Sequence, residues 1–564
     1  MITDPETKTM SAKKISLFAF CFLIYKLLAA QSLPVGFSNA EDFLRRSQLV
    51  NQFDSSVSLG VRPLTVMSNL EKVSSAGFKS DGLFEVIPLT KDDSLYILPV
   101  SLVTKFNSHH PTGWNDGSFA PNKGLQTRLS AGVFLQHNKW SLQLNPELIY
   151  SENKPFDQFT DDHYDVIWQR IYRWWNTIDE PVRFGTENSF RFHPGQSFLK
   201  YDLGRFSVGA SSESLWWGPG KRNSLIMSNN APGFYHLTFH TNGPVQTEIG
   251  SFEGQFISGI LANSGFTPPE PERKFLQTQL YYAPKNESRY LSGVTLAWQP
   301  KWVPGLFLGY SRTSQVYYWE IKSFRDVQPF LNGKREEGVE PNPKLTNNQQ
   351  QSSGYLRWLL PESNAEFYIE YGTNGRTRGL REFLVQANRH RAFTIGLSKI
   401  YPIKKNRFVQ FDAEITQLGQ VVREVVRDAD SWYTDKYVRQ GYTNQGQVIG
   451  AGIGPGSNVF YFETSWWMGM KKIGIFAERL VHNNDFLYYA YEDSKDWRRF
   501  WTDLSAGVVA DWKFNRLVLS STFRWTISWN YQWYLIQEPG DPYFVKGRDV
   551  NNIYATVNAA YFFR

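Results

Sequence analysis

The sequence predicts an all-β protein, a transmembrane outer-membrane β-barrel of roughly 16 to 18 antiparallel strands with a small N-terminal helical periplasmic segment. Three observations predict this fold. Many segments alternate apolar and polar residues, aromatic residues make up 16% of the chain, and the chain ends inside an amphipathic aromatic segment. The 564 residues are expected to divide into a signal peptide (1–30), an N-terminal helical or mixed periplasmic segment (31–95) and the barrel (96–564).

The composition excludes several other classes of protein. The mean hydropathy is −0.42 and 20% of the residues are charged, which excludes a bundle of membrane-spanning helices, since each needs ~20 apolar residues. The aromatic content excludes a disordered chain. The formal net charge of +7 is small for this length and both signs are interspersed, so we expect no nucleic-acid partner. A single cysteine excludes a disulfide framework and a cysteine-rich zinc site.

The first 30 residues have the pattern of a secretory signal. Lys13 and Lys14 precede the apolar stretch 15–30, and cleavage is expected at its end. A transmembrane anchor is the alternative, but Lys26 shortens the apolar run. Cys21 lies inside the signal, so the mature chain is expected to contain no cysteine, which suits an oxidising compartment.

A short helix is expected after the signal. Ser38 is the candidate N-cap, and Glu41 completes a capping box three residues later. The segment around it is too small to form an independent large domain. Apolar residues fall on one face of the helix and two arginines on the other, namely Phe43, Leu44, Val50 and Phe53 against Arg45 and Arg46.

From about residue 96 the hydrophobic pattern has a period of two, which places alternate side chains on opposite faces of a strand. The segments run for about nine to twelve residues, the length of a tilted membrane strand, so a soluble sandwich is the less favoured alternative. The clearest examples are 125–136, 365–372, 409–417, 504–512 and 517–528. Their polar faces carry carboxylates, as expected of a water-filled lumen: Glu366, Glu370, Asp412 and Glu414.

The last segment, 553–563, alternates in the same way and ends in aromatic residues. It resembles the C-terminal signal of outer-membrane barrels, although Arg564 follows the final aromatic residue. Such a barrel must close, because an open edge in lipid leaves backbone groups unsatisfied. The Gly-, Pro- and Asn-rich stretches 263–273 and 332–348 are expected to be long loops.

No catalytic or nucleotide-binding motif is complete. The stretch 218–221 resembles part of a phosphate loop, but the earlier glycine is missing and Arg222 replaces the Ser or Thr that holds magnesium. The stretch 450–456 lacks the third glycine of a dinucleotide motif. The nine histidines are scattered, and His236 and His240 in an alternating stretch are a weak metal candidate. We therefore expect no cofactor and no enzymatic activity.

The block 211–234 resembles a known family. It reads SSESLWWGPGKRNSLIMSNNAPGF, and it is similar to the corresponding block of the capsule-assembly Wzi family. The similar stretches cover about residues 110 to 260. The Trp-Trp-Gly-Pro-Gly run resembles the sequences of the Bacteroidota branch of this family. The other stretches are NDG (115–117), KGLQ (123–126), IDEPVRFG (178–185), PGQS (194–197) and IGSFEGQ (249–255).

The resemblance implies an outer-membrane barrel that binds and organises or anchors capsular or extracellular polysaccharide at the cell surface, in a lectin-like and non-enzymatic way. Aromatic rings stack on sugar faces, and amides, cations and carboxylates bind hydroxyl and uronate groups. The candidate glycan-binding residues are Trp216, Trp217, Lys221, Arg222, Asn223, Asn229 and Asn230. Their alternative role is packing, in an interfacial girdle or in a loop.

The expected partners are the polysaccharide, the lipid of the outer membrane and the barrel-assembly machinery, and the protein is expected to be a monomer. Two other functions stay open. The same barrel, with its charged lumen face, could conduct solutes or a polymer. An outer-membrane hydrolase acting on lipid or glycan is the third hypothesis, with Glu187, Glu213 and Glu253 as candidate acids.

Overall fold

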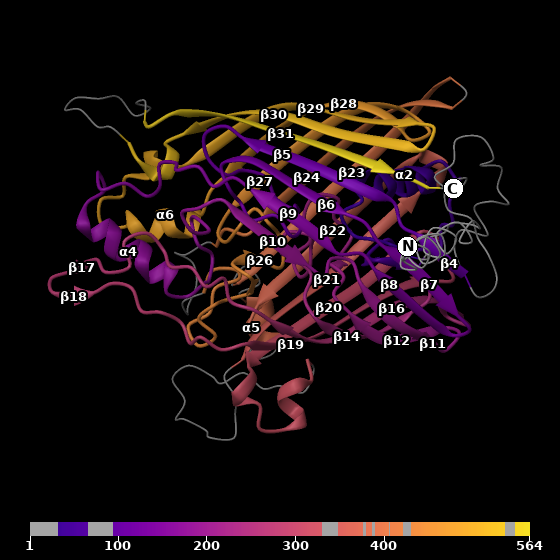
Figure 1. The fold of residues 1–564 in the computed structure, drawn as a ribbon, viewed down its shortest axis with the longest axis horizontal. Helices are drawn as coiled ribbons and strands as arrows, with labels where there is room; N and C mark the ends of the chain where they lie inside the picture. Colours follow the sequence, from indigo (N-terminus) through magenta and orange to yellow (C-terminus); the bar gives the residue numbers. More distant parts are fainter. Residues whose placement is uncertain are drawn as a thin grey trace, which may run out of the picture.

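A closed β-barrel dominates the structure (Figure 1). The computed structural model describes residues 32–65, 94–329, 348–375, 380–385, 390–404, 406–420, 430–535 and 547–563. The expected signal peptide (1–30) and most of the expected loop 332–348 lie outside these described residues. None of the helices in the described ranges is long and apolar enough to cross a membrane.

The barrel wall is built from 23 strand segments in the described ranges. They are β4 (Ser94–Ile97), β5 (Val100–Asn107), β6 (Gly124–Ser130), β7 (Val133–His137), β8 (Trp140–Leu144), β9 (Glu147–Ser151), β10 (Ser189–His193), β11 (Phe198–Asp202), β12 (Phe206–Ser211), β14 (His236–Thr241), β15 (Val245–Thr247), β16 (Gly250–Leu261), β19 (Arg289–Pro300), β20 (Leu306–Tyr317), β21 (Gln349–Leu360), β22 (Ala365–Asn374), β23 (Arg391–Lys404), β24 (Arg407–Gln417), β27 (Asn458–Met468), β28 (Lys471–Val481), β29 (Thr502–Phe514), β30 (Leu517–Trp529) and β31 (Val550–Tyr561).

The remaining elements lie in the lumen or in the connections. The short strands are β1 (Ser32–Leu33), β2 (Val61–Arg62), β3 (Leu64–Thr65), β13 (Trp216–Trp217), β17 (Lys274–Phe275), β18 (Thr278–Gln279), β25 (Thr443–Asn444) and β26 (Gln447–Val448). The helices are α2 (Ser38–Leu49), α4 (Asp165–Trp175), α5 (Leu380–Val385) and α6 (Asn484–Ala490), and the 3-10 turns are η2 (Tyr318–Glu320), η3 (Phe324–Val327), η4 (Pro361–Ser363), η5 (Trp497–Arg499) and η6 (Tyr531–Trp533).

Five pairs of consecutive wall segments are single strands that are briefly interrupted. These are β4–β5, β6–β7, β8–β9, β10–β11 and β14–β15, so the 23 segments form 18 strands, the upper end of the predicted range. All neighbours along the wall are antiparallel, and β31 pairs with β5 to close the barrel. The predicted antiparallel barrel is confirmed.

Short turns join the strands at one end of the barrel, and long connections join them at the other. Residues 515–516 connect β29 to β30, and the last strand ends at this short-turn end, with Tyr561 opposite Leu517. Helix α2 also lies there, whereas α4 and α6 lie at the opposite end (Figure 1). Bacterial barrels have short periplasmic turns and longer outer loops, so α2 and the end of β31 face the periplasm.

The predicted alternation of faces is confirmed in the wall. On β24, Phe411 is 38% exposed, while its neighbours Gln410 and Asp412 are buried. On the last strand, Val557 is exposed toward the lipid side and Tyr554 is buried. The predicted segment 125–136 keeps its alternation, but it is interrupted between β6 and β7.

The N-terminal segment 32–65 folds into the periplasmic mouth of the barrel. Leu49 at the end of α2 packs with Leu359, Ile400 and Trp467 of the wall. The side chains of Arg45 and Arg46, predicted on the face opposite the apolar one, are also buried, because the barrel surrounds the helix.

The predicted capping box of this helix is wrong. The N-cap residue is Phe37, and it makes no side-chain cap hydrogen bond, whereas Ser38 is already the first helical residue. The Glu41 carboxylate instead contacts the Arg62 guanidinium at 3.3 Å, which ties α2 to β2.

Protein fills much of the described lumen. We call three segments together the lumen plug: 32–65, 212–235 and 430–457. The last two form an apolar core against the inner wall, around Trp217, Leu225, Ile226, Met227, Trp432, Tyr433, Tyr442 and Ile449. The carboxylates on the polar strand faces suited a water-filled lumen, but the sequence left open whether the lumen is plugged; in the structure this apolar core packs against the inner wall.

An aromatic cap covers the outer end of the barrel. We call α4, α6 and the connections packed on them the outer cap. Its core is made of Phe159, Ile167, Trp168, Ile171, Tyr172, Trp175, Leu280, Phe486, Leu487, Ala490, Tyr491 and Trp533. The expected loop 263–273 runs beside it without a regular element, as predicted.

Candidate functional site

The two tryptophans of the block 211–234 lie inside the barrel. β13 pairs with β2 of the N-terminal segment, and Trp216 and Trp217 are 4% and 0% exposed. The Arg62 guanidinium lies 4.4 Å from the centroid of the Trp216 ring. The Trp217 indole N–H donates to Gln255 of the wall at 2.9 Å. The pair therefore joins the N-terminal segment to the wall.

The chain after these tryptophans wraps around a carboxylate of the wall. The backbone N–H groups of Lys221, Arg222 and Asn223 donate to Glu414 at 2.8, 3.0 and 2.9 Å. The Tyr368 hydroxyl donates to the same carboxylate at 2.7 Å. Successive backbone N–H groups form an anion-binding concavity, and here the anion belongs to the protein itself. Glu414 thus faces inward as predicted, but the lumen plug binds it.

The two cations of the block pair with the wall through their side chains. The Lys221 ammonium lies 2.8 Å from Asp412 and 3.4 Å from Asp42 of α2. Burial lowers the pKa of Lys221, but these two carboxylates outweigh burial and raise that pKa above its usual value. The Arg222 guanidinium contacts Glu478 at 3.1 Å. Removing one member of such a buried pair typically costs about 3–5 kcal/mol, so these pairs hold the block in place.

The three asparagines of the candidate set bind the protein's own chain. The Asn229 amide donates to the Asn115 carbonyl at 3.0 Å, and the Asn230 amide donates to the Val448 carbonyl at 2.9 Å. Asn223 is 1% exposed beside Glu414. The structure therefore brings the seven candidate residues together as internal contacts of the lumen plug, and their role in glycan binding stays a prediction.

A polar cavity of about 320 Å³ lies between α2, the block and the wall. Lys221, Arg222 and Asn229 of the candidate set line it. Because acids and bases are nearly balanced around it, the cavity has no strong preference for either sign of ligand charge. The other charged lining residues are Glu41, Asp42, Asp116, Asp412, Glu414, Glu463 and Asp511 with Arg45, Arg62, Arg128 and Lys472.

The three candidate acids of the hydrolase hypothesis are engaged separately. The Glu213 carboxylate accepts from the Lys200 ammonium at 2.6 Å, and the Glu253 carboxylate accepts from the Ser58 backbone at 3.1 Å. Glu187 is exposed on the connection before β10. Two of the three therefore have structural partners inside the barrel.

The cluster that anchors α2 is absent from the candidate set. Glu366 of β22 is completely buried, and its two carboxylate oxygens bind Arg45 at 2.6 Å and Arg357 at 2.8 Å. Arg357 also donates to the side chain of Gln48 and to the carbonyl of Ser58, at 2.9 Å each. The sequence offered two signals, namely adjacent arginines on a predicted helix and a carboxylate on the inner face of a strand. Neither signal indicates locally that the two side chains pair with each other.

The fold and its filled lumen define a plugged outer-membrane β-barrel. The chain belongs to the capsule assembly protein Wzi family, because the model of that family matches residues 111–502. A search of curated proteins finds no significant match.

Several solved structures are similar to the chain. One is Wzi of Escherichia coli, described as an outer-membrane, carbohydrate-binding β-barrel involved in group 1 capsule assembly, with a TM-score of 0.60, 11% identity, and coverage of 95% of this chain and 100% of that chain. Another is OccAB2 of Acinetobacter baumannii, with a TM-score of 0.39, 9% identity, and coverage of 83% and 98%. The outer-membrane channel DcaP of the same species has a TM-score of 0.32, 6% identity, and coverage of 84% and 98%.

Proposed function

We propose that the protein binds capsular or extracellular polysaccharide and anchors or organises it at the cell surface, as a lectin-like protein without enzymatic activity. The observation that carries this proposal is membership of the capsule assembly family together with a barrel fold shared over 95% of the chain. The occupied lumen supports a binding role over conduction. A polymer bound through many weak contacts needs no deep catalytic pocket.

The outer cap is the surface best suited to a polymer outside the cell. Tyr164, the residue before α4, is 76% exposed, and Arg173 on the same helix is also exposed, with its guanidinium 4.6 Å from the Tyr489 ring centroid. Tyr164 offers an exposed ring that can stack on a sugar face, and Arg173 offers a separate cation on the same helix that can pair with a uronate. The cap core beneath holds both side chains on a packed support.

The residues first identified in the sequence remain second candidates. Lys221, Arg222 and Asn229 line the polar cavity and could contact a sugar that enters it. Trp216, Trp217, Asn223 and Asn230 support the shape of that cavity from within the lumen plug.

The proposal includes the remaining partners. The apolar outer wall contacts outer-membrane lipid, and the aromatic last strand β31 is a recognition element for the barrel-assembly machinery. The protein is proposed to act as a monomer. The Trp-Trp-Gly-Pro-Gly run supports assignment to the Bacteroidota branch of the family.

A deletion strain complemented with variants tests the proposal. Deletion is expected to move polysaccharide from the cells to the medium at an unchanged total, and the wild-type gene should reverse this. A Tyr164→Ala/Arg173→Ala variant should release polysaccharide. Trp302→Ala is the control, since Trp302 is also an exposed ring (67%) but lies in the periplasmic turn after β19.

Two further arms separate the alternatives. Lys221→Gln and Arg222→Gln address the polar cavity: release by these variants, with the outer-cap variant retaining polysaccharide, moves the site into the lumen. An unchanged partition after deletion refutes the capsule role. Product release from purified polysaccharide by the intact protein refutes its non-enzymatic character.

A further inference from the structure

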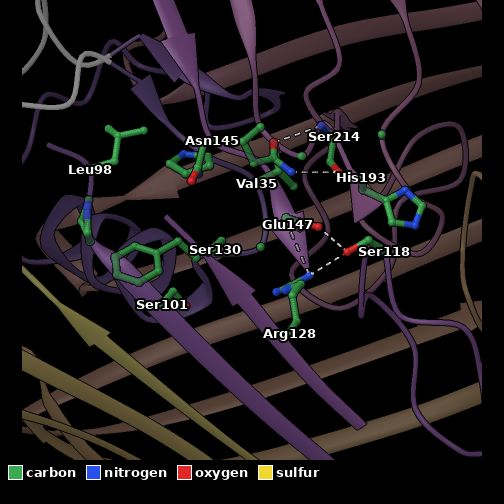
Figure 2. A pocket seen from close by; sticks show the side chains of 18 of the residues that line it. Val35, Leu98, Ser101, Ser118, Arg128, Ser130, Asn145, Glu147, His193 and Ser214 are labelled. Atoms are coloured by element: carbon green, nitrogen blue, oxygen red, sulfur yellow. Dashed lines mark hydrogen bonds and ion pairs between the residues drawn. The ribbon is translucent and has the colours of Figure 1, made fainter. Parts of the chain in front are cut away.

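A second cavity, of about 130 Å³, lies between the N-terminal segment and the wall strands β4 to β12 (Figure 2). Phe562 and Phe563 at the end of the chain line it, as does Val35 before α2, which places it at the periplasmic end of the barrel. A buried water needs only about 10–15 Å³ of such space, so the cavity has room for a group the size of a ring.

The cavity lies behind a line of interruptions in the wall, which we call the wall crease. Four neighbouring strands break at matching register. The first breaks fall between the pairs Ile97–Val133 and Ser101–Ser130, and the next between Leu144–Val133 and Glu147–Ser130. The fourth strand breaks between the pairs His193–Glu147 and Phe198–Gln143. Each break contains a residue that disrupts a ladder, since proline lacks a donor and glycine permits a bulge. These residues are Pro99, Gly132, Pro146 and Pro194.

Side chains replace part of the lost backbone pairing at the wall crease. The Gln143 amide donates to the Gln196 carbonyl at 2.6 Å, and the Ser197 hydroxyl accepts from the Asn145 backbone N–H at 2.9 Å. The Gln143 bond uses its amide nitrogen and leaves its amide oxygen without a partner. The Asn145 bond uses only the backbone and does not engage the side-chain amide.

Three polar side-chain atoms around the cavity have no hydrogen-bond partner among the described residues. They are the Gln143 Oε1, the Asn145 Oδ1 and the His193 Nε2. All three residues line the cavity, and Gln143 and His193 are only 1% and 7% exposed. A buried polar atom without a partner costs roughly 1–3 kcal/mol, so the arrangement favours a ligand that supplies donors.

The charges around the cavity cancel, which indicates an uncharged ligand. The Arg128 guanidinium and the Glu147 carboxylate are 4.0 Å apart, and the Ser118 hydroxyl contacts both (Figure 2). Apolar side chains also line the cavity, among them Val35 and Leu98. Hydrogen-bond acceptors and apolar surface in one cavity match the hydroxyl groups and the carbon face of a neutral pyranose.

We propose that this cavity binds one uncharged sugar residue from the periplasmic side. The inference rests on the proposed function for the choice of glycan, and it adds a second, inner contact to the outer one. The amide oxygens of Gln143 and Asn145 accept from sugar hydroxyls, and His193 accepts or donates according to its tautomer. The apolar side chains pack against the carbon face of the ring.

Saturation-transfer NMR on the full, detergent-solubilised protein tests this. The probes are the methyl glycosides of glucose, galactose, mannose and N-acetylglucosamine, with methyl glucuronide as the charged comparison and laurate as an acyl-chain comparison. At least one neutral glycoside should receive saturation, and methyl glucuronide should not. Ser130→Phe fills the cavity from its inner wall and should abolish the signal. Leu129→Phe is the matched control, because Leu129 is the adjacent residue on β6 and is 41% exposed on the lipid side.

A milder variant keeps the test valid if Ser130→Phe fails to fold. His193→Leu removes one hydrogen bond and should weaken binding by about fivefold. The proposal is overturned if no neutral glycoside binds the folded wild type, if Ser130→Phe or His193→Leu binds as wild type does, or if laurate alone binds. Capsule retention by the same variants is scored separately. If the wild type retains the capsule but binds no glycoside, only the inner site is refuted. If capsule retention is lost on deletion of the gene but not in the cavity variants, the outer-cap variant decides the proposed function.

Discussion

Substituting Glu366 by glutamine is expected to release α2 from the periplasmic mouth. The side chain keeps its size, but the two buried guanidinium groups of Arg45 and Arg357 lose their shared counter-charge. Arg45 belongs to the helix and reaches water if the helix leaves. Arg357 belongs to the wall and stays. The substitution therefore penalises the docked state more than the undocked one.

The magnitude follows from the burial of the cluster. Glu366 and Arg357 are completely buried and Arg45 is 5% exposed, so solvent does not screen the lost interaction. Breaking a buried ion pair by removing one partner costs about 3–5 kcal/mol. Since each 1.4 kcal/mol is a factor of ten, the undocked population should rise by at least about 10²-fold.

Hydrogen exchange of the α2 amides measures that population directly. Exchange of these amides should accelerate by the same factor in Glu366→Gln, while amides of β29 and β30 keep their protection. Glu362→Gln is the matched control, because it removes the same charge from the exposed turn η4 on the same hairpin. Unchanged α2 protection in Glu366→Gln would refute the view that this cluster holds the helix.

Two other results are expected. Burial lowers the pKa of His163 in the outer cap from 6.5 to about 4. As the pH falls, this histidine is therefore protonated in the unfolded cap before it is protonated in the folded one. The free energy of unfolding of the cap should decrease by up to about 3 kcal/mol between pH 6.5 and pH 4. Tryptophan fluorescence should report this loss, and His163→Gln should remove most of the pH dependence; an unchanged profile in the variant contradicts the assignment. Trp217→Ala should destabilise the protein by about 3–5 kcal/mol by leaving a cavity, and the heat-dependent shift of the barrel on gels should move to lower temperature. Trp302→Ala, at an exposed ring, should leave that temperature unchanged.

The wall was predictable because each strand carries its own signal. Phe411 and Asp412 alternate in sequence and lie on opposite sides of the wall, and this relation needs only the neighbouring residues. The same local reasoning placed Glu414 on the inner face correctly. It failed for Ser38, because a capping box is defined by local spacing, whereas Glu41 instead pairs with Arg62, which lies 21 residues away.

The interior was not predictable for the same reason. The tryptophans at 216 and 217 signal either sugar stacking or packing, and only their neighbours decide between the two. Those neighbours, Arg62 and Gln255, come from distant parts of the chain. The family resemblance indicated the class of protein without showing that its most distinctive block is buried.

The wide separation of its contacts also fixes the order in which the molecule can be completed. The backbone amides of 221–223 bind Glu414, which lies 191 residues after Asn223 in the sequence. Arg45 binds Glu366, which lies 321 residues after it. Contacts so distant in sequence form slowly, because a long loop must close before any of them is gained. A chain that ends before β22 lacks the partner of its own first helix, so the interior contacts can be completed only when the last third of the chain has joined the barrel.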